Sequence, residues 1–210
     1  MMAAVLVAGL CLPILTTCAR VPVSDRPGTL VDVAKVCPSI RIELRYGTAR
    51  NGVGRAVYPR GARCLLRRDV ARRLCRVQGR LREKGLGLKV WDGYRPPSAQ
   101  RALWQVKPDR RFVAPPAKGS KHNRGAAVDL TLVTSDGRDV PMPCDFDTFD
   151  RRSRPTYAGG TREQRASRDT LRAAMIAEGF LPDRNEWWHF NAPDWRRYGI
   201  IDVSLKLSGR

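Results

Sequence analysis

The sequence contains only two histidines among its 210 residues, and each has a carboxylate close by. His122 stands seven positions before Asp129, and Glu186 stands three positions before His189. Two imidazoles and one aspartate make up the three-ligand set of a catalytic zinc site, which keeps a fourth position for water. Zinc lowers the pKa of that water to about 7, and Glu186 can accept its proton and pass it to a leaving amine. These residue types therefore predict metal-assisted amide hydrolysis.

Spacing alone leaves other interpretations open. Short patterns such as H-x6-D and E-x-x-H also occur by chance, so His122 and His189 could be unrelated structural or surface residues. If they do bind a metal, two nitrogens and one carboxylate oxygen would suit cobalt or nickel as well as zinc.

Four segments have the composition of strands, and two of them carry the histidine–carboxylate pairs. Alternating or β-rich residues favour strands in residues 39–46, at the start of 87–97, in 127–133 and in 186–190. Asp129 lies inside the third of these strands, and His122 lies in the loop before it. A turn of that length can bring an imidazole and a carboxylate to one point.

Three further segments favour helices. Apolar residues at helical spacing predict a helix over residues 65–85, and Ser98 is expected to cap a second helix. Thr161 begins a capping-box pattern for a third helix over residues 161–179. The alternation of strands and helices predicts a single compact α+β domain. Its mostly antiparallel sheet would be flanked by helices, with the zinc site at the sheet.

The first residues are expected to be a leader rather than part of the fold. Residues 1–18 carry no charged side chain, and their apolar core is short for a membrane span. We expect a signal peptide or a lipoprotein leader with lipid attachment at Cys18, then a linker over 19–34 and the catalytic domain over 35–210. This predicts a periplasmic or cell-envelope protein. A mis-assigned start would place it in the cytoplasm.

The chain is strongly basic, with 39 lysines and arginines against 20 acidic residues and a formal net charge of +19. Such a charge suits an anionic partner such as nucleic acid. The arginines are spread along the whole chain, however, and no nucleic-acid-binding motif accompanies them. We therefore expect no specific nucleic-acid partner, and binding through charge alone remains the alternative.

Four cysteines remain once the leader is set aside, namely Cys37, Cys64, Cys75 and Cys144. An even number permits two disulfides in an oxidising compartment, with three pairings open. Four reduced thiols are the alternative. No C-x-x-C pair is present, so a thiolate zinc site is not expected.

Five segments resemble one known family. "SKHNRGAAVDLTL" is similar to the S-x-H-x-x-G-x-A-x-D signature of the zinc D-Ala-D-Ala peptidases, and "EWWH" to their second signature. "VWDGYRP", "RYGTARNGVGR" and "DFDTFD" resemble motifs of the VanX-type D-alanyl-D-alanine dipeptidases in particular. The five segments follow the family order over residues 39–190. The resemblance implies one zinc ion per chain and hydrolysis of D-alanyl-D-alanine to two D-alanines in peptidoglycan turnover.

The resemblance also implies roles for individual residues. The zinc ligands would be His122, Asp129 and His189. Glu186 would act as general base and acid, and Arg95 would stabilise the oxyanion of the transition state.

Three residues would form the substrate pocket by the same resemblance, namely Asp147, Ser120 and Tyr46. A carboxylate such as Asp147 would pair with the free ammonium of a dipeptide and reject N-acylated chains. Asp145 and Asp150 are alternative partners for that ammonium, and Tyr46 could instead be a core residue.

Other functions compete with strict dipeptide hydrolysis. Residues 98–119 form a shorter segment than in the family prototypes, where it walls a narrow pocket. A shorter wall would open the pocket to longer peptides, which suits a D,D- or L,D-carboxypeptidase acting on peptidoglycan stem peptides. A zinc-structured module that binds peptidoglycan without cleaving it is a further alternative, although such a module would be free to lose Glu186 and Arg95.

Overall fold

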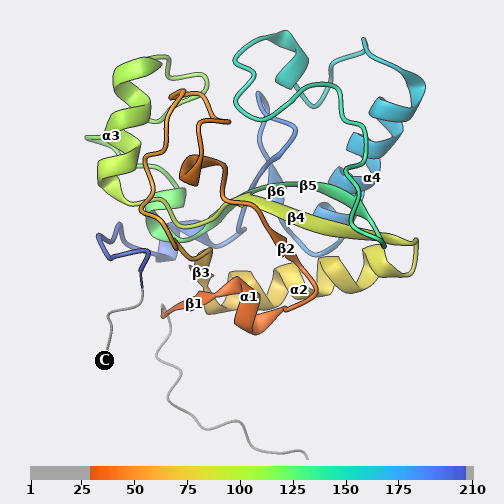
Figure 1. Ribbon diagram of the computed structural model, residues 1–210, viewed down its shortest axis with the longest axis horizontal. Coiled ribbons are helices and arrows are strands. Elements are labelled where there is room, and N and C mark those ends of the chain that lie inside the picture. Colours follow the sequence, from red (N-terminus) through yellow and green to blue (C-terminus); the bar gives the residue numbers. More distant parts are fainter. Residues whose placement is uncertain (1–28, 207–210) are drawn as a thin grey trace, which may run out of the picture.

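The computed structural model describes residues 29–206, which form one α+β domain built around a central sheet (Figure 1). The predicted leader at residues 1–18 lies outside the described residues. Within the described part, no helix is long and apolar enough to cross a membrane.

The central sheet has five strands and is mostly antiparallel, as predicted. Its strands, in spatial order, are β2 (Arg41–Ile42), β4 (Leu86–Asp92), β5 (Ala127–Thr134), β7 (His189–Asn191) and β6 (Leu181–Pro182). Only β2 and β4 run parallel. The two long central strands, β4 and β5, therefore form the platform on which the rest of the domain is arranged.

Two helices cover one face of this sheet. Along β5, Val128, Leu130 and Leu132 are fully buried and share a face, because side chains alternate across a strand. The helices α2 (Arg68–Arg82) and α4 (Arg162–Ala177) pack on that side (Figure 1). The opposite face of β5 carries Asp129, so the polar chemistry lies on the side away from α2 and α4.

The remaining elements surround this layer. The helices α1 (Val33–Val36) and α3 (Pro97–Val106) and the two-stranded sheet of β1 (Leu30–Asp32) and β3 (Leu65–Arg67) complete the regular structure. Short 3₁₀ helices are η1 (Arg45–Gly47), η2 (His122–Arg124), η3 (Arg151–Ser153) and η4 (Trp195–Arg197). Because β1 pairs with β3, Leu30–Asp32 belong to the folded domain, although they lie inside the segment 19–34 that was expected to be a linker.

Several predicted boundaries differ from the structure. The strand expected over 39–46 is limited to β2, because the chain then turns into η1 and buries Tyr46 there. The helix expected over 65–85 starts later, because its first residues form β3. Of the strand expected over 186–190, only the end from His189 onward is strand.

The helix starts were predicted with mixed success. Ser98 does not cap α3, which begins at Pro97 with Pro96 as its N-cap, since a proline suits the first helical position. The capping box of α4 is confirmed. Thr161 Oγ1 accepts from the Gln164 backbone N–H, and the Gln164 side chain accepts from the Thr161 N–H.

Candidate active site

Three neighbouring strands place polar side chains in one row across the sheet. Asp129 of β5 lies opposite Asp92 of β4 on one side and opposite His189 of β7 on the other. Residues directly opposite each other in a sheet project from the same face. The strand register thus brings together three residues that are far apart in sequence.

His122 reaches this row from the loop before β5. It begins η2, which ends at Gly125 in the left-handed conformation with φ 66°. A Cβ on Gly125 would come within 2.5 Å of a Leu30 side-chain carbon, so glycine is required for both backbone conformation and space. The turn at Gly125 leads directly into β5 and places His122 next to Asp129.

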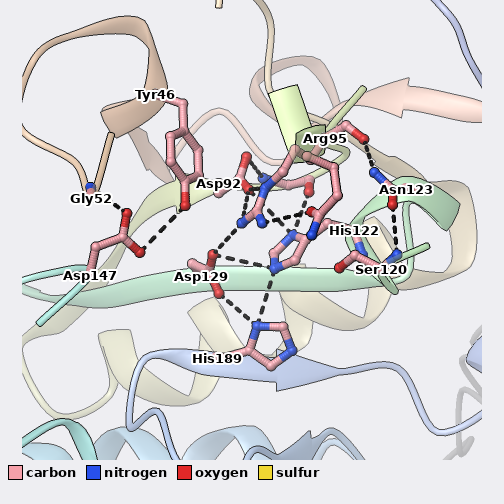
Figure 2. Close-up of polar contacts among 12 residues, drawn as sticks. Tyr46, Gly52, Asp92, Arg95, Ser120, His122, Asn123, Asp129, Asp147 and His189 are labelled. Carbon is pink, nitrogen blue, oxygen red and sulfur yellow. Dashed lines mark hydrogen bonds and ion pairs between the residues drawn. The ribbon is translucent and has the colours of Figure 1, made fainter. Parts of the chain in front are cut away.

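The side chains of His122, Asp129 and His189 converge on one point (Figure 2). His122 Nε2 lies 3.1 Å from His189 Nδ1 and 3.3 Å from Asp129 Oδ2, and His189 Nδ1 lies 2.9 Å from Asp129 Oδ1. All three residues are buried. The structure therefore assembles the His/Asp/His group that was predicted to bind a metal.

The two imidazoles are oriented by partners on their other nitrogens. His122 Nδ1 lies 2.7 Å from the Gly93 carbonyl oxygen, and His189 Nε2 lies 2.9 Å from Asn191 Oδ1. With Nδ1–H of His122 and Nε2–H of His189 donating to these oxygens, the converging nitrogens keep their lone pairs. Metal-binding histidines are typically held in this way.

Electrostatics at this point favour a cation. Burial tends to lower the pKa of His189, but the Asp129 carboxylate outweighs burial and raises that pKa to about 9. Burial likewise tends to raise the pKa of Asp129, yet the neighbouring His122 and His189 hold it well below its usual value. Asp129 therefore stabilises positive charge where the two imidazoles converge.

Glu186 lies beside the ligand group, where a general base was predicted. Its Oε2 is 3.9 Å from His189 Nδ1, and its side chain is 12% exposed. It belongs to the turn before β7, so the spacing E-x-x-H places it next to the ligand. Burial raises the pKa of Glu186 well above its usual value, which makes its carboxylate a strong proton acceptor.

Arg95 is held rigidly on the other side of Asp129. Its Nε donates to Asp92 Oδ2 at 2.9 Å, its Nη1 to Gln100 Oε1 at 3.1 Å and its Nη2 to Asp129 Oδ2 at 3.4 Å. The guanidinium also lies over the Tyr46 ring, 4.7 Å from its centroid. It is therefore a fixed positive charge directly adjacent to the ligand group.

Asp147 and Tyr46 form a pair at one side of the site. Asp147 Oδ2 accepts from the Gly52 N–H at 2.7 Å, and Oδ1 accepts from the Tyr46 hydroxyl at 3.4 Å. Burial raises the pKa of Asp147 to about 7. Asp147 also adopts a φ of 54°, which is unusual for a residue other than glycine.

The two alternative carboxylates have other partners. Asp145 is largely exposed and pairs with Arg45 at 3.3 Å, while Asp150 caps η3 by accepting from the Arg152 N–H. Asp147 alone of the three lines the pocket described below. Tyr46 was predicted either to line the substrate pocket or to belong to the core. Its side chain is buried in the core and also lines the pocket.

Ser120 lies on the opposite side of the ligand group from Asp147 (Figure 2). Its Oγ accepts from the His122 N–H at 3.2 Å, and its own N–H donates to Asn123 Oδ1 at 2.6 Å. Ser120 therefore both stabilises the start of η2 and faces the pocket.

All eight predicted site residues line a single pocket of about 380 Å³. It reaches from Asp147 and Tyr46, past the ligand group, to Ser120 and Lys121. Trp188 also lines it, whereas Trp187 packs in the core. The volume is in the range of small-molecule sites.

Sequence reasoning missed three residues that shape the site, namely Asp92, Gln100 and Asn191. Asp92 and Gln100 fix Arg95, and Asn191 orients His189. A signal for Asn191 was present, because residues two apart on a strand share a face. Asp92 likewise stands three positions before Arg95 within the "WDGYRP" motif.

Comparison with known proteins agrees with this geometry. The family described as D-ala-D-ala dipeptidase (Peptidase_M15) matches residues 26–202. A D-alanyl-D-alanine dipeptidase of Escherichia coli is 38% identical over 172 residues, covering 82% of this chain and 89% of that protein. Those of Enterococcus faecalis and Streptomyces coelicolor are each 32% identical, covering 74% and 78% of this chain and 87% and 91% of the relatives. This chain is therefore a member of the D-Ala-D-Ala dipeptidase family of peptidases.

Proposed function

We propose that this protein is a zinc-dependent dipeptidase that hydrolyses D-alanyl-D-alanine to two D-alanines. One observation carries the proposal: a single pocket combines a His/Asp/His ligand group, the adjacent carboxylate of Glu186 and a second, partly buried carboxylate, Asp147. The first two features suit hydrolysis, and the third suits a substrate with a free amino terminus.

The donor set fits zinc. Two imidazole nitrogens and one carboxylate are a three-ligand set of the kind found at catalytic zinc, and both imidazoles are oriented by further hydrogen bonds. A zinc ion held by His122, Asp129 and His189 would supply Lewis acidity and make water a good nucleophile near neutral pH.

Two residues next to the ligand group supply proton transfer and charge. Glu186 accepts a proton from the attacking water and returns it to the leaving amine, for which its buried, strongly basic carboxylate is suited. Arg95 offers its guanidinium to the oxygen that becomes negative when the amide carbon turns tetrahedral. Because Asp92 and Gln100 already hold Arg95 in place, little reorganisation is needed.

Asp147 determines which end of the peptide enters this part of the pocket. An incoming ammonium can pair with its carboxylate, which retains the Gly52 N–H and the Tyr46 hydroxyl as donors. An N-acylated peptide cannot make this pair and would leave a buried carboxylate uncompensated. The pocket therefore favours a free dipeptide over a longer chain.

The decisive experiment compares D-Ala-D-Ala with N-acetyl-D-Ala-D-Ala, with D-alanine release as the measurement. We expect rapid release from the free dipeptide and little from the capped one. Equal cleavage of both would instead support a carboxypeptidase acting on stem peptides. Cleavage of neither by protein that contains zinc would favour a module that binds peptidoglycan without hydrolysing it.

We further propose that the enzyme acts on peptidoglycan fragments or precursors in the periplasm or cell envelope. The uncharged residues 1–18 support export, with lipid attachment at Cys18 as a route to the membrane. Cell fractionation, together with mass spectrometry of the mature N-terminus, tests this. A full-length cytoplasmic protein would overturn the location but not the activity.

A further inference from the structure

Cys37 and Cys75 are neighbouring thiols on the helix-covered side of the sheet. Cys75 lies in α2, and its Sγ donates to the Val36 carbonyl oxygen at 3.5 Å. Val36 is bonded to Cys37, so this contact places the Cys75 sulfur against the backbone of Cys37. Cys37 is also near enough to raise the pKa of the Cys75 thiol.

The surrounding contacts hold the two thiols together. The helix α1 packs beside α2 (Figure 1), and Cys37 follows α1 directly. One turn after Cys75, Gln78 Nε2 donates to the Ser39 carbonyl oxygen at 3.4 Å. Gln78 Oε1 in turn accepts from the Leu88 N–H at 2.8 Å, which anchors this side chain to β4. Contacts on both sides of Cys37 therefore keep this segment on α2.

The other two described cysteines have different neighbours. Cys64 is buried beside Gly93, where a Cβ would come within 3.1 Å of its sulfur. Cys144 Sγ accepts from Trp187 Nε1 at 3.4 Å. Among the four described cysteines, the contacts therefore bring together only Cys37 and Cys75.

We propose that Cys37 and Cys75 form a disulfide in the presence of a low-molecular-weight disulfide, whereas Cys64 and Cys144 remain thiols. The half-buried Cys75 thiolate attacks the oxidant's S–S bond, forms a mixed disulfide and releases one thiolate. The Cys37 thiolate then attacks the Cys75 sulfur and releases the second. The two protein thiols lose two electrons and two protons in all, and the oxidant becomes two thiols.

The environment of the pair sets the conditions for this reaction. Burial, with the neighbouring Cys37 thiol adding to it, raises the pKa of Cys75 to about 12. Little thiolate is present at neutral pH, so oxidation is slow there and faster at higher pH. The pair belongs to the α1–α2 side, away from the face that carries Asp129, so its oxidation should leave dipeptide turnover unchanged.

The test uses the full chain treated with oxidised glutathione at pH 8.5, followed by alkylation of free thiols and peptide mapping by mass spectrometry. We expect a linked Cys37–Cys75 peptide and alkylated Cys64 and Cys144. The cross-link constrains the unfolded chain, so Tm should rise by roughly 5–10 °C and fall back on reduction. Cys75→Ser should show neither effect, whereas the matched variant Cys144→Ser should behave like the unsubstituted protein.

Several results would overturn the proposal. These are complete alkylation of Cys37 and Cys75 after oxidation, or a link from either of them to Cys64, Cys144 or a leader cysteine. D-alanine release from D-Ala-D-Ala is measured on the same samples, so that failure of the disulfide proposal can be distinguished from failure of the proposed function. Activity with no cross-link rejects only the disulfide, and a cross-link with no activity rejects only the dipeptidase.

Discussion

Individual residues in the pocket have different surroundings, from which we infer different roles. Glu186 and Asp147 are both partly buried carboxylates with a raised pKa, yet only Glu186 lies beside the ligand group. Asp147 is instead held by Gly52 and Tyr46 at one side of the pocket. This separation predicts that substitutions at the two positions affect different kinetic parameters.

Replacing Glu186 by glutamine should abolish turnover and leave the metal in place. Glutamine keeps the size of the side chain but cannot accept a proton, so kcat should fall by about 10²–10⁴-fold. Zinc content, measured by atomic absorption, should stay near one per chain. Glu178→Gln is the matched control, because Glu178 pairs with Arg76 and Arg80 of α2 and does not line the pocket. A near-normal kcat in Glu186→Gln would show that another group is the base.

Replacing Asp147 by asparagine should weaken substrate binding and stabilise the fold. Without the carboxylate the ammonium loses its partner, so kcat/KM for D-Ala-D-Ala should fall at least about tenfold. Asparagine tolerates the positive φ and can still accept from the Gly52 N–H.

The stability effect of Asp147→Asn should depend on pH. Burial raises the carboxyl pKa from 3.8 to about 7 in the folded protein, so the ionised form destabilises the fold progressively as pH rises through that range. The gain in unfolding free energy of the variant should therefore grow between about pH 4 and 7 and then level off. Urea unfolding in the presence of a chelator measures this, and a gain that shrank with pH would contradict it.

At the scale of elements, the register of β5 against β7 creates the ligand group. Asp129 lies opposite His189, and the next residue of β7 on the same face, Asn191, holds the far nitrogen of His189. The strand therefore supplies both a ligand and the group that orients it. If the group binds zinc as proposed, this arrangement would give Asn191 a role in metal affinity, although Asn191 is not one of the three ligands.

Replacing Asn191 by alanine should lower zinc affinity about 10–100-fold, because His189 loses the acceptor that fixes its ring. Competition with a chromogenic chelator measures the affinity, and kcat should recover at saturating zinc. Asn191→Asp keeps an acceptor at the same place and should retain zinc. Equal affinity in Asn191→Ala and the unsubstituted protein would show that packing alone orients His189.

At the scale of the molecule, one metal would connect the loop at η2 to two strands of the central sheet. A ligand that binds only the folded state stabilises it by an amount that grows with the logarithm of the ligand concentration relative to its Kd. The two-helix layer on the other face does not depend on this connection. Removing the metal should therefore lower the stability of the domain without unfolding it.

Dialysis against a chelator should lower Tm by roughly 5–10 °C, as expected for loss of a ligand present at about 100 times its Kd. Added zinc should restore Tm, as followed by differential scanning calorimetry. His122→Ala should show the low Tm from the start and should not respond to chelator. An unchanged Tm after measured zinc loss would mean that the apo site is already rigid.

Patterns of residues close together in the sequence were sufficient to predict the features that depend only on neighbouring residues. The capping box at Thr161, the strand around Asp129 and the residue types of a zinc site could all be recognised because each depends on neighbours within a few positions. The pairs His122–Asp129 and Glu186–His189 are of the same kind. Family resemblance then joined these local signals into one predicted function.

Only the tertiary structure decided which distant groups meet. The match of Asp129 with both Asp92 and His189 depends on strand register, and a shift of one residue would turn Asp129 to the other face. The choice of Asp147 over Asp145 and Asp150 depends on how one loop turns towards Gly52. Such contacts arise from packing and hydrogen bonding over many intervening residues, and no spacing in the sequence encodes them.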